Sequence, residues 1–111
     1  MTMALAEKTP IECRNQLVDY LESGCKPKAN WLIGTEHEKF GFTVADNTPL
    51  PYEGPGGVRA VLTALQTRFG WSPIMEGDNI IGLNAPRDVG GTISLEPGGQ
   101  LELSGAPLAD L

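Results

Sequence analysis

Two short runs of alternating polar and apolar residues, residues 92–96 and 100–104, are separated by Pro97, Gly98 and Gly99. Proline and glycine are typical of tight connections, so this pattern predicts a β-hairpin. Alternate side chains of a strand lie on opposite faces, which gives the hairpin one apolar and one polar face. The apolar face has Leu95, Leu101 and Leu103, and the polar face has Ser94, Glu96, Gln100, Glu102 and Ser104.

A helix and two further strands precede this hairpin in the sequence. Apolar residues recur at helical spacing from residue 58 to residue 69, and Gly70 follows as a helix end. The repeating positions are Val58, Val61, Leu62, Leu65 and Phe69. Residues 71–75 and 79–83 read as strands around a turn at Gly77 and Asp78. These elements predict an α+β fold, an antiparallel sheet with flanking helices.

Helices are also expected near both ends of the chain. Thr9 is a good N-cap, Pro10 suits a first helical position, and Gly24 suits a left-handed C-terminal residue. Pro107 and Leu108 predict the beginning of another helix, which could not complete its turns before the last residue. We therefore expect a truncated chain.

Composition limits the classes of function and location. The net charge of −6, from 14 acidic and 8 basic residues, argues against nucleic-acid binding. No stretch approaches the roughly 20 consecutive apolar residues that a membrane-spanning helix needs. Residues 1–9 resemble neither a secretory signal nor an organelle transit peptide, so a cytoplasmic location is expected.

A further strand is predicted from residue 31 to about residue 44, and it carries paired carboxylates. On this strand Glu36, Glu38, Phe40 and Phe42 share one face. Two glutamates about 7 Å apart repel each other by roughly 2.5 kcal/mol at an effective dielectric constant of about 20. A divalent cation would offset this repulsion.

Four glutamates could form one acidic pocket if this strand meets the polar face of the hairpin. Glu36, Glu38, Glu96 and Glu102 would then be metal ligands, and oxygen-only ligands suit Mg²⁺ or Mn²⁺. The alternative is that each is an ordinary solvent-exposed glutamate. His37 points away from Glu36 and Glu38 on the strand, which favours a surface role.

Three strings of the sequence resemble the plant and bacterial branch of the glutamate–cysteine ligases, in the order of that family. They are IGTEHEKFGF at residues 33–42, MEGDNIIGL at residues 75–83 and ISLEPGGQLELSGAPL at residues 93–108. The resemblance implies an ATP- and magnesium-dependent ligase that forms γ-glutamylcysteine from glutamate and cysteine, the first step of glutathione biosynthesis. It also implies a glutamine-synthetase-like catalytic fold, with Glu36, Glu38, Glu96 and Glu102 as magnesium ligands.

The resemblance further implies that residues 1–111 are a single incomplete domain, the amino-terminal portion of the ligase's catalytic domain. We expect such a fragment to be inactive alone and to self-associate through an exposed sheet edge. Two alternatives remain open: a free-standing, non-catalytic domain that binds a divalent ion or a protein, and a related carboxylate–amine ligase. A reading frame continuing past Leu111 would favour a ligase over the free-standing domain.

Overall fold

The structure is a computed structural model in which residues 10–111 are described. The chain divides into two compact units, Met1–Trp31 and Leu32–Leu111. Within residues 10–111, no helix is long and apolar enough to span a membrane.

The first unit contains helix α1, Arg14–Glu22, which begins later than the sequence predicts. Thr9 lies outside the described residues, and Pro10 is not helical. Cys13 is the N-cap, with extended backbone angles of φ −150° and ψ 161°. The Gln16 side chain accepts a hydrogen bond from the Cys13 backbone N–H over 3.1 Å. This capping by Gln16 explains why the helix begins after the predicted Thr9 and Pro10 pair.

The end of α1 also differs from the prediction in its geometry. The C-cap is Ser23, which is right-handed at φ −60°, and its backbone N–H donates to Asp19 O over 2.9 Å. Gly24 has no positive φ angle, so its predicted left-handed conformation is wrong. A single-turn 3₁₀ helix, Lys28–Asn30, follows in the same unit.

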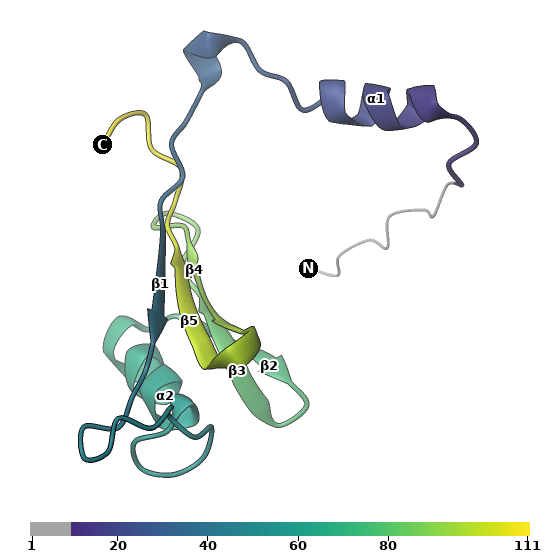
Figure 1. The fold of residues 1–111 in the computed structure, drawn as a ribbon. Helices are drawn as coiled ribbons and strands as arrows, with labels where there is room; N and C mark the ends of the chain where they lie inside the picture. The colour runs from purple at the N-terminus through teal and green to yellow at the C-terminus, as the bar shows by residue number, and fades with distance from the viewer. Residues whose placement is uncertain (1–9) are drawn as a thin grey trace. The chain divides into compact units, whose positions relative to one another are not determined.

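The second unit is built on a five-stranded antiparallel sheet (Figure 1). Its strands are β1 Glu36–Phe40, β2 Ser72–Glu76, β3 Asn79–Asn84, β4 Thr92–Glu96 and β5 Gln100–Ser104. The order across the sheet is β1-β5-β4-β3-β2, so β1 and β2 are its edges. With helix α2, Val58–Phe69, this sheet confirms the predicted α+β class and the antiparallel arrangement.

The predicted hairpin is present at its predicted residues, whereas the first strand is shorter than predicted. A 3₁₀ turn at Pro97–Gly99 joins β4 to β5. Phe40 at the end of β1 pairs with Gln100, the first residue of β5. The residues directly before Gln100 form the 3₁₀ turn, so β1 has no strand to pair with after Phe40. Phe42 makes only an isolated bridge, to Pro49.

The end of the chain is extended where a helix is predicted. Leu108 forms an antiparallel bridge with Ile33, and their backbone N–H and C=O groups bond reciprocally over 2.7 and 2.8 Å. No helix is present from Pro107 to Leu111. This non-local pairing overrides the local helix signal of Pro107, so the predicted helix is wrong.

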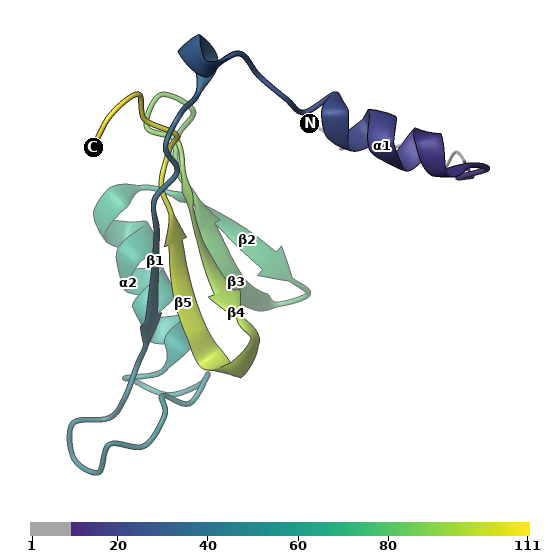
Figure 2. The same cartoon turned by 45° about the horizontal axis from the view of Figure 1, so that its top comes forward.

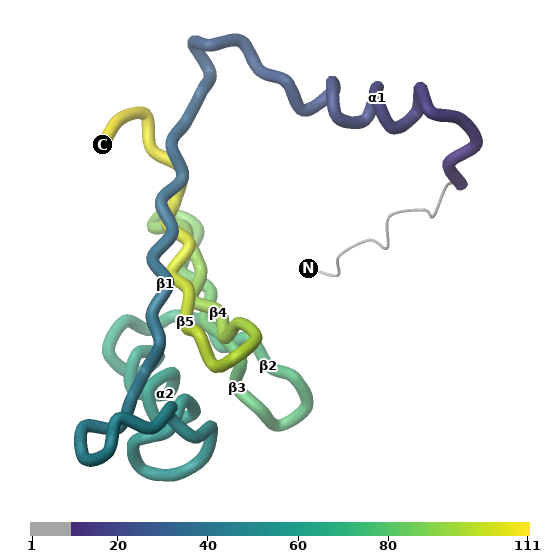
Figure 3. Tube along the Cα trace, viewed as in Figure 1, coloured from purple at the N-terminus to yellow at the C-terminus, as the bar shows by residue number. Residues whose placement is uncertain are grey.

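Helix α2, Val58–Phe69, lies where the sequence predicts it and packs against one face of the sheet (Figures 1 and 2). It ends at Gly70, which is left-handed at φ 68°. Figure 3 follows the chain from β1 through a long loop into this helix. The buried core consists of Val58 and Leu62 from α2 with Ile80 and Leu83 from β3. Leu62 and Leu83 are fully buried.

An irregularity in β3 allows both of its core residues to reach α2. Residues three apart on a regular strand lie on opposite faces, yet Ile80 and Leu83 are both in the core. The register steps from Ile74 opposite Gly82 to Met75 opposite Ile80, which leaves Ile81 as an extra residue. This is a β-bulge, and it changes the face to which the strand's side chains point.

Candidate functional site

The register of the sheet places the four predicted glutamates on the face opposite α2. Glu38 of β1 lies opposite Glu102 of β5, and Glu102 lies opposite Ser94 of β4. Directly opposite residues on paired strands point to the same face. We call this surface the polar face; across β1, β4 and β5 it carries Glu36, Glu38, Ser94, Glu96, Gln100, Glu102 and Ser104, together with Thr92 and the exposed Phe40.

Glu38 and Glu102 are the closest of the four in the register. Directly opposite residues in an antiparallel pair have Cβ atoms about 4.5–5.5 Å apart, and like charges at such positions destabilise the sheet. Glu36 lies two residues before Glu38 on the same face, opposite Ser104. Glu96 lies opposite Gln100. The sheet therefore brings Glu38 and Glu102 together and places Glu36 and Glu96 at positions farther along.

Burial and hydrogen bonding divide the four carboxylates into two pairs. Glu36 and Glu38 on the edge strand are exposed, while Glu96 and Glu102 are half-buried. Ser94 Oγ donates a hydrogen bond to Glu96 Oε1 over 2.7 Å. Ser104 Oγ donates to Glu102 Oε1 over 2.6 Å.

The donor set of the polar face suits a hard divalent cation by its chemistry. Its carboxylates and hydroxyls are oxygen ligands, with no thiolate or imidazole among them, and such sets are typical of Mg²⁺ and Mn²⁺ sites. Within residues 10–111, no three His, Cys, Asp or Glu side chains converge closely enough to form a complete metal site. The assignment of all four glutamates as metal ligands stays a prediction.

Ser94 and Ser104 lie on the polar face, as the sequence predicts, whereas their hydrogen bonds to the glutamates are not among the predictions. A signal for these bonds was present in the sequence. Each serine lies two residues from a glutamate on the same strand, and that spacing places both side chains on one face at neighbouring positions. A Ser-x-Glu or Glu-x-Ser pattern on a predicted strand therefore indicates a carboxylate with a local hydrogen-bond donor.

His37 lies on the opposite face from the glutamates, as predicted, because it pairs with Leu103 of β5. There it lines a pocket of about 370 Å³ beside the C-terminal half of α2. The lining is mainly apolar and consists of His37, Lys39, Leu65, Ile93, Leu101, Glu102 and Leu103. His37 is therefore separated from the carboxylate side chains by the sheet itself.

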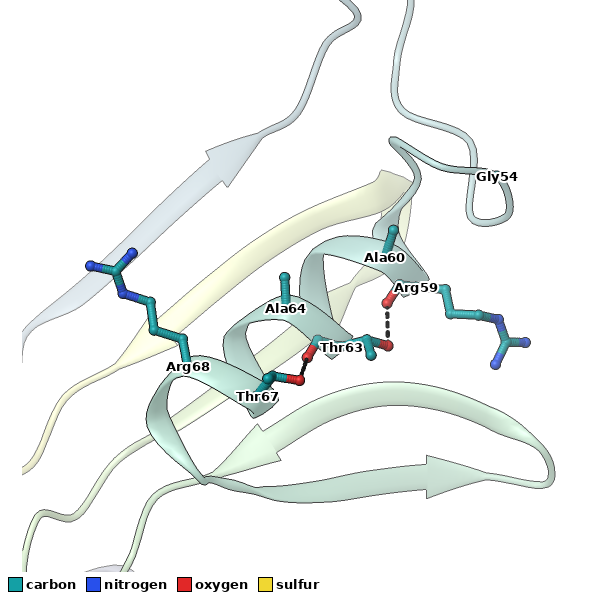
Figure 4. A pocket seen from close by; sticks show the side chains of 7 residues that line it. All are labelled: Gly54, Arg59, Ala60, Thr63, Ala64, Thr67 and Arg68. Carbon is teal, nitrogen blue, oxygen red and sulfur yellow. Dashed lines mark hydrogen bonds between the residues drawn. The ribbon is translucent and has the colours of Figure 1, made fainter.

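A second, shallow pocket lies on the solvent-facing side of α2, away from the polar face (Figure 4). Its threonine hydroxyls are bonded within the helix, Thr63 Oγ1 to Arg59 O over 2.8 Å and Thr67 Oγ1 to Thr63 O over 2.9 Å. Arg59 forms an ion pair with Glu53 over 2.9 Å, and this partner raises the pKa of the Arg59 guanidinium. These groups already have partners, so the pocket offers little to a polar ligand.

The family model described as Glutamate-cysteine ligase family 2 matches residues 32–111. The match begins at the first residue of the second compact unit, Leu32. A glutamate–cysteine ligase of Medicago truncatula is 53% identical over 98 residues, which cover 88% of this chain and 18% of that protein. Glutamate–cysteine ligase A of Oryza sativa subsp. japonica is 54% identical over 98 residues, covering 88% and 19% respectively.

The relatives also correct one prediction. Both proteins are named chloroplastic, as is the 51% identical ligase of Arabidopsis thaliana. The predicted cytoplasmic location is therefore wrong. Residues 1–9, on which that prediction rested, lie outside the described part of the chain. The chain spans about a fifth of the length of these relatives.

Proposed function

Because the chain belongs to the glutamate–cysteine ligase family 2, we propose that its polar face is part of an ATP- and magnesium-dependent ligase site. The reaction would join the γ-carboxyl group of glutamate to the amino group of cysteine. One observation carries the proposal: the family match covers the sheet unit whose open face bears Glu36, Glu38, Glu96 and Glu102. The family relationship also supports a glutamine-synthetase-like fold for the whole enzyme, with residues 1–111 as part of its catalytic domain.

The proposed chemistry needs an activated carboxyl group, because a carboxylate is a poor electrophile. The γ-phosphoryl group of ATP would transfer to a γ-carboxylate oxygen of glutamate, releasing ADP and forming an acyl phosphate. The cysteine nitrogen would then attack the acyl carbon, the bond to phosphate would break, and the nitrogen would lose a proton. Magnesium ions would supply positive charge against the phosphate oxygens.

In this proposal the residues of the chain hold and orient metal ions. Glu38 and Glu102 are the first candidates, because they lie directly opposite each other in the register. Glu36 and Glu96 would extend the ligand set along the same face. The basic residues that would hold the substrates are expected in other parts of the enzyme, so we expect residues 1–111 alone to be inactive.

Location and association follow as further parts of the proposal. The names of the relatives support a chloroplast location. Strand β1 is a sheet edge. Phe40 at its end and Phe42 just beyond it are 58% and 54% exposed, which supports self-association of this chain through that edge. The acidic net charge of −6 supports partners other than nucleic acid.

Calorimetric titration of the 111-residue chain with Mg²⁺ and Mn²⁺, with and without ATP, tests the proposal. We expect saturable binding that a Glu38→Gln/Glu102→Gln variant weakens at least tenfold. Glu22→Gln is the matched control, because it removes an exposed carboxylate from α1 in the other unit. Equal affinity in all three proteins, or no saturable binding by the folded chain, would overturn a metal-holding role for the polar face.

A further inference from the structure

Two serines on the polar face each hold a glutamate of their own strand. Ser94 Oγ donates to Glu96 Oε1 over 2.7 Å, and Ser104 Oγ donates to Glu102 Oε1 over 2.6 Å. Hydrogen bonds of a hydroxyl to a carboxylate are charge-assisted, and these lengths are within the usual range of about 2.5–2.7 Å. All four side chains are half-buried, so solvent competes less for these bonds than at an exposed site.

The two hydrogen bonds incline both carboxylates in the same direction. Ser94 precedes Glu96 by two residues in β4, whereas Ser104 follows Glu102 by two residues in β5. Strands β4 and β5 are antiparallel, with Ser94 opposite Glu102. Both glutamates are therefore drawn toward the same end of the sheet, the end at which β4 begins and β5 stops.

Each carboxylate of the hairpin is drawn toward the row of a different glutamate of β1. Glu96 is drawn toward the row of Ser94, which also contains Glu102 and Glu38. Glu102 is drawn toward the row of Ser104, which also contains Glu36. The serine hydroxyls thus bring Glu96 closer to the row of Glu38 and Glu102 closer to the row of Glu36, while the spacing between Glu96 and Glu102 along the strands is unchanged.

The glutamates of β1 have no comparable support. Among the residues that the structure describes, neither Glu36 nor Glu38 has a hydrogen-bonded side-chain partner, and both are exposed on an edge strand. Their side chains can therefore change rotamer more freely than those of Glu96 and Glu102. The polar face consists of a pre-oriented half on β4 and β5 and an adaptable half on β1.

We propose that Ser94 and Ser104 are positioning residues that orient Glu96 and Glu102 for a divalent cation. The inference rests on the proposed function, because it assigns these serines to the same metal-holding face. Each hydroxyl engages one carboxylate oxygen, Oε1, and leaves Oε2 to bind the cation. Residues that orient metal ligands in this way commonly change affinity by about 10–100-fold when they are removed.

The experiment uses Ser94→Ala, Ser104→Ala and their double variant in the 111-residue chain, titrated with Mn²⁺ alone in a calorimeter. We expect the affinity to fall about tenfold in each single variant and further in the double variant, by analogy with other metal-ligand supports. Ser104→Thr retains the hydroxyl and should restore most of the affinity. Ser72→Ala is the matched control, since Ser72 lies on the same face at the far edge, opposite Asn84 of β3.

A second measurement separates positioning from a general structural role. Carbon-13 relaxation of the Glu96 and Glu102 side-chain methylenes, recorded without metal, should show greater mobility in the alanine variants and no change in Ser72→Ala. Wild-type binding that both alanine variants leave unchanged would overturn the positioning role alone. Absence of saturable Mn²⁺ binding by the wild-type chain would overturn the proposed function together with it.

Discussion

The two faces of the sheet differ in what their side chains contribute. On the face covered by α2, Leu83 and Ile93 pair across strands and pack with Leu62 of the helix. On the polar face, one row across the sheet consists of Gly82 on β3, Ser94 on β4, Glu102 on β5 and Glu38 on β1. Because side chains alternate along each strand, the same strands supply both surfaces. Burial of apolar side chains on one face stabilises the sheet, so the other face can hold carboxylates that repel one another.

The cover over the apolar face is incomplete. Helix α2 packs on β3, while the pocket beside His37 and Lys39 lies over β1 and β5. Leu103 of β5 is 38% exposed on this face, whereas Leu83 of β3 is fully buried. Stability should therefore depend most on the α2 and β3 contacts.

The largest effect is expected on the covered face. Leu62→Ala should lower the free energy of unfolding by about 2–5 kcal/mol, because it leaves a cavity in a fully buried site. Urea denaturation followed by circular dichroism would measure the loss. Thr67→Ala on the exposed side of the same helix is the control and should stay within about 0.5 kcal/mol. A similar loss in both variants would contradict the assigned core.

One position on the polar face should behave as a packing site. A methyl group at Gly82 would lie 2.4 Å from the backbone oxygen of Ile93, which cannot move without disturbing the sheet. Gly82→Ala should therefore lower the free energy of unfolding by about 1–3 kcal/mol. Gly34 has no atoms within 4 Å of the same added group, so Gly34→Ala is the matched control. An unchanged denaturation midpoint in Gly82→Ala would show that β3 and β4 lie farther apart at Gly82 than the structure indicates.

A smaller effect is expected for a polar contact beside the core. Tyr52 packs against the core, and its hydroxyl donates a hydrogen bond to Ile80 O over 2.8 Å. Tyr52→Phe keeps the ring and removes this bond, so the free energy of unfolding should fall by about 0.5–1.5 kcal/mol. Tyr20→Phe, on the exposed surface of α1, is the control. Equal unfolding curves for Tyr52→Phe and the wild type would rule out a stabilising hydrogen bond.

The smallest effect should have the opposite sign. Glu38→Gln removes one of two like charges at directly opposite positions, so without metal it should stabilise the chain by about 0.2–0.5 kcal/mol. The gain should disappear in about 1 M salt, where the screening length falls to about 3 Å. Thermal unfolding at low and high salt measures the gain in stability and its dependence on salt. Destabilisation at low salt would mean that Glu38 has a favourable partner in the fold.

Local sequence signals predicted the elements whose structure depends on near neighbours. Helix α2 begins at Val58 and ends before Gly70 because its apolar repeat and its glycine are sufficient to define it. The β4–β5 hairpin follows from alternation around Pro97, Gly98 and Gly99. The shared face of the glutamates follows from the same alternation, once β1 pairs with β5.

Pairing between distant segments decided the features that the sequence did not reveal. β1 ends at Phe40 because β5 offers no partner beyond Gln100, and Leu108 is extended because it bonds to Ile33. The bulge at Ile81 places Ile80 in the core by its pairing with β2. The inclination of Glu96 and Glu102 depends on where the antiparallel register places Ser94 and Ser104. Short-range periodicity determines which face a side chain occupies, whereas strand length, register and neighbouring partners depend on contacts between residues far apart in the chain.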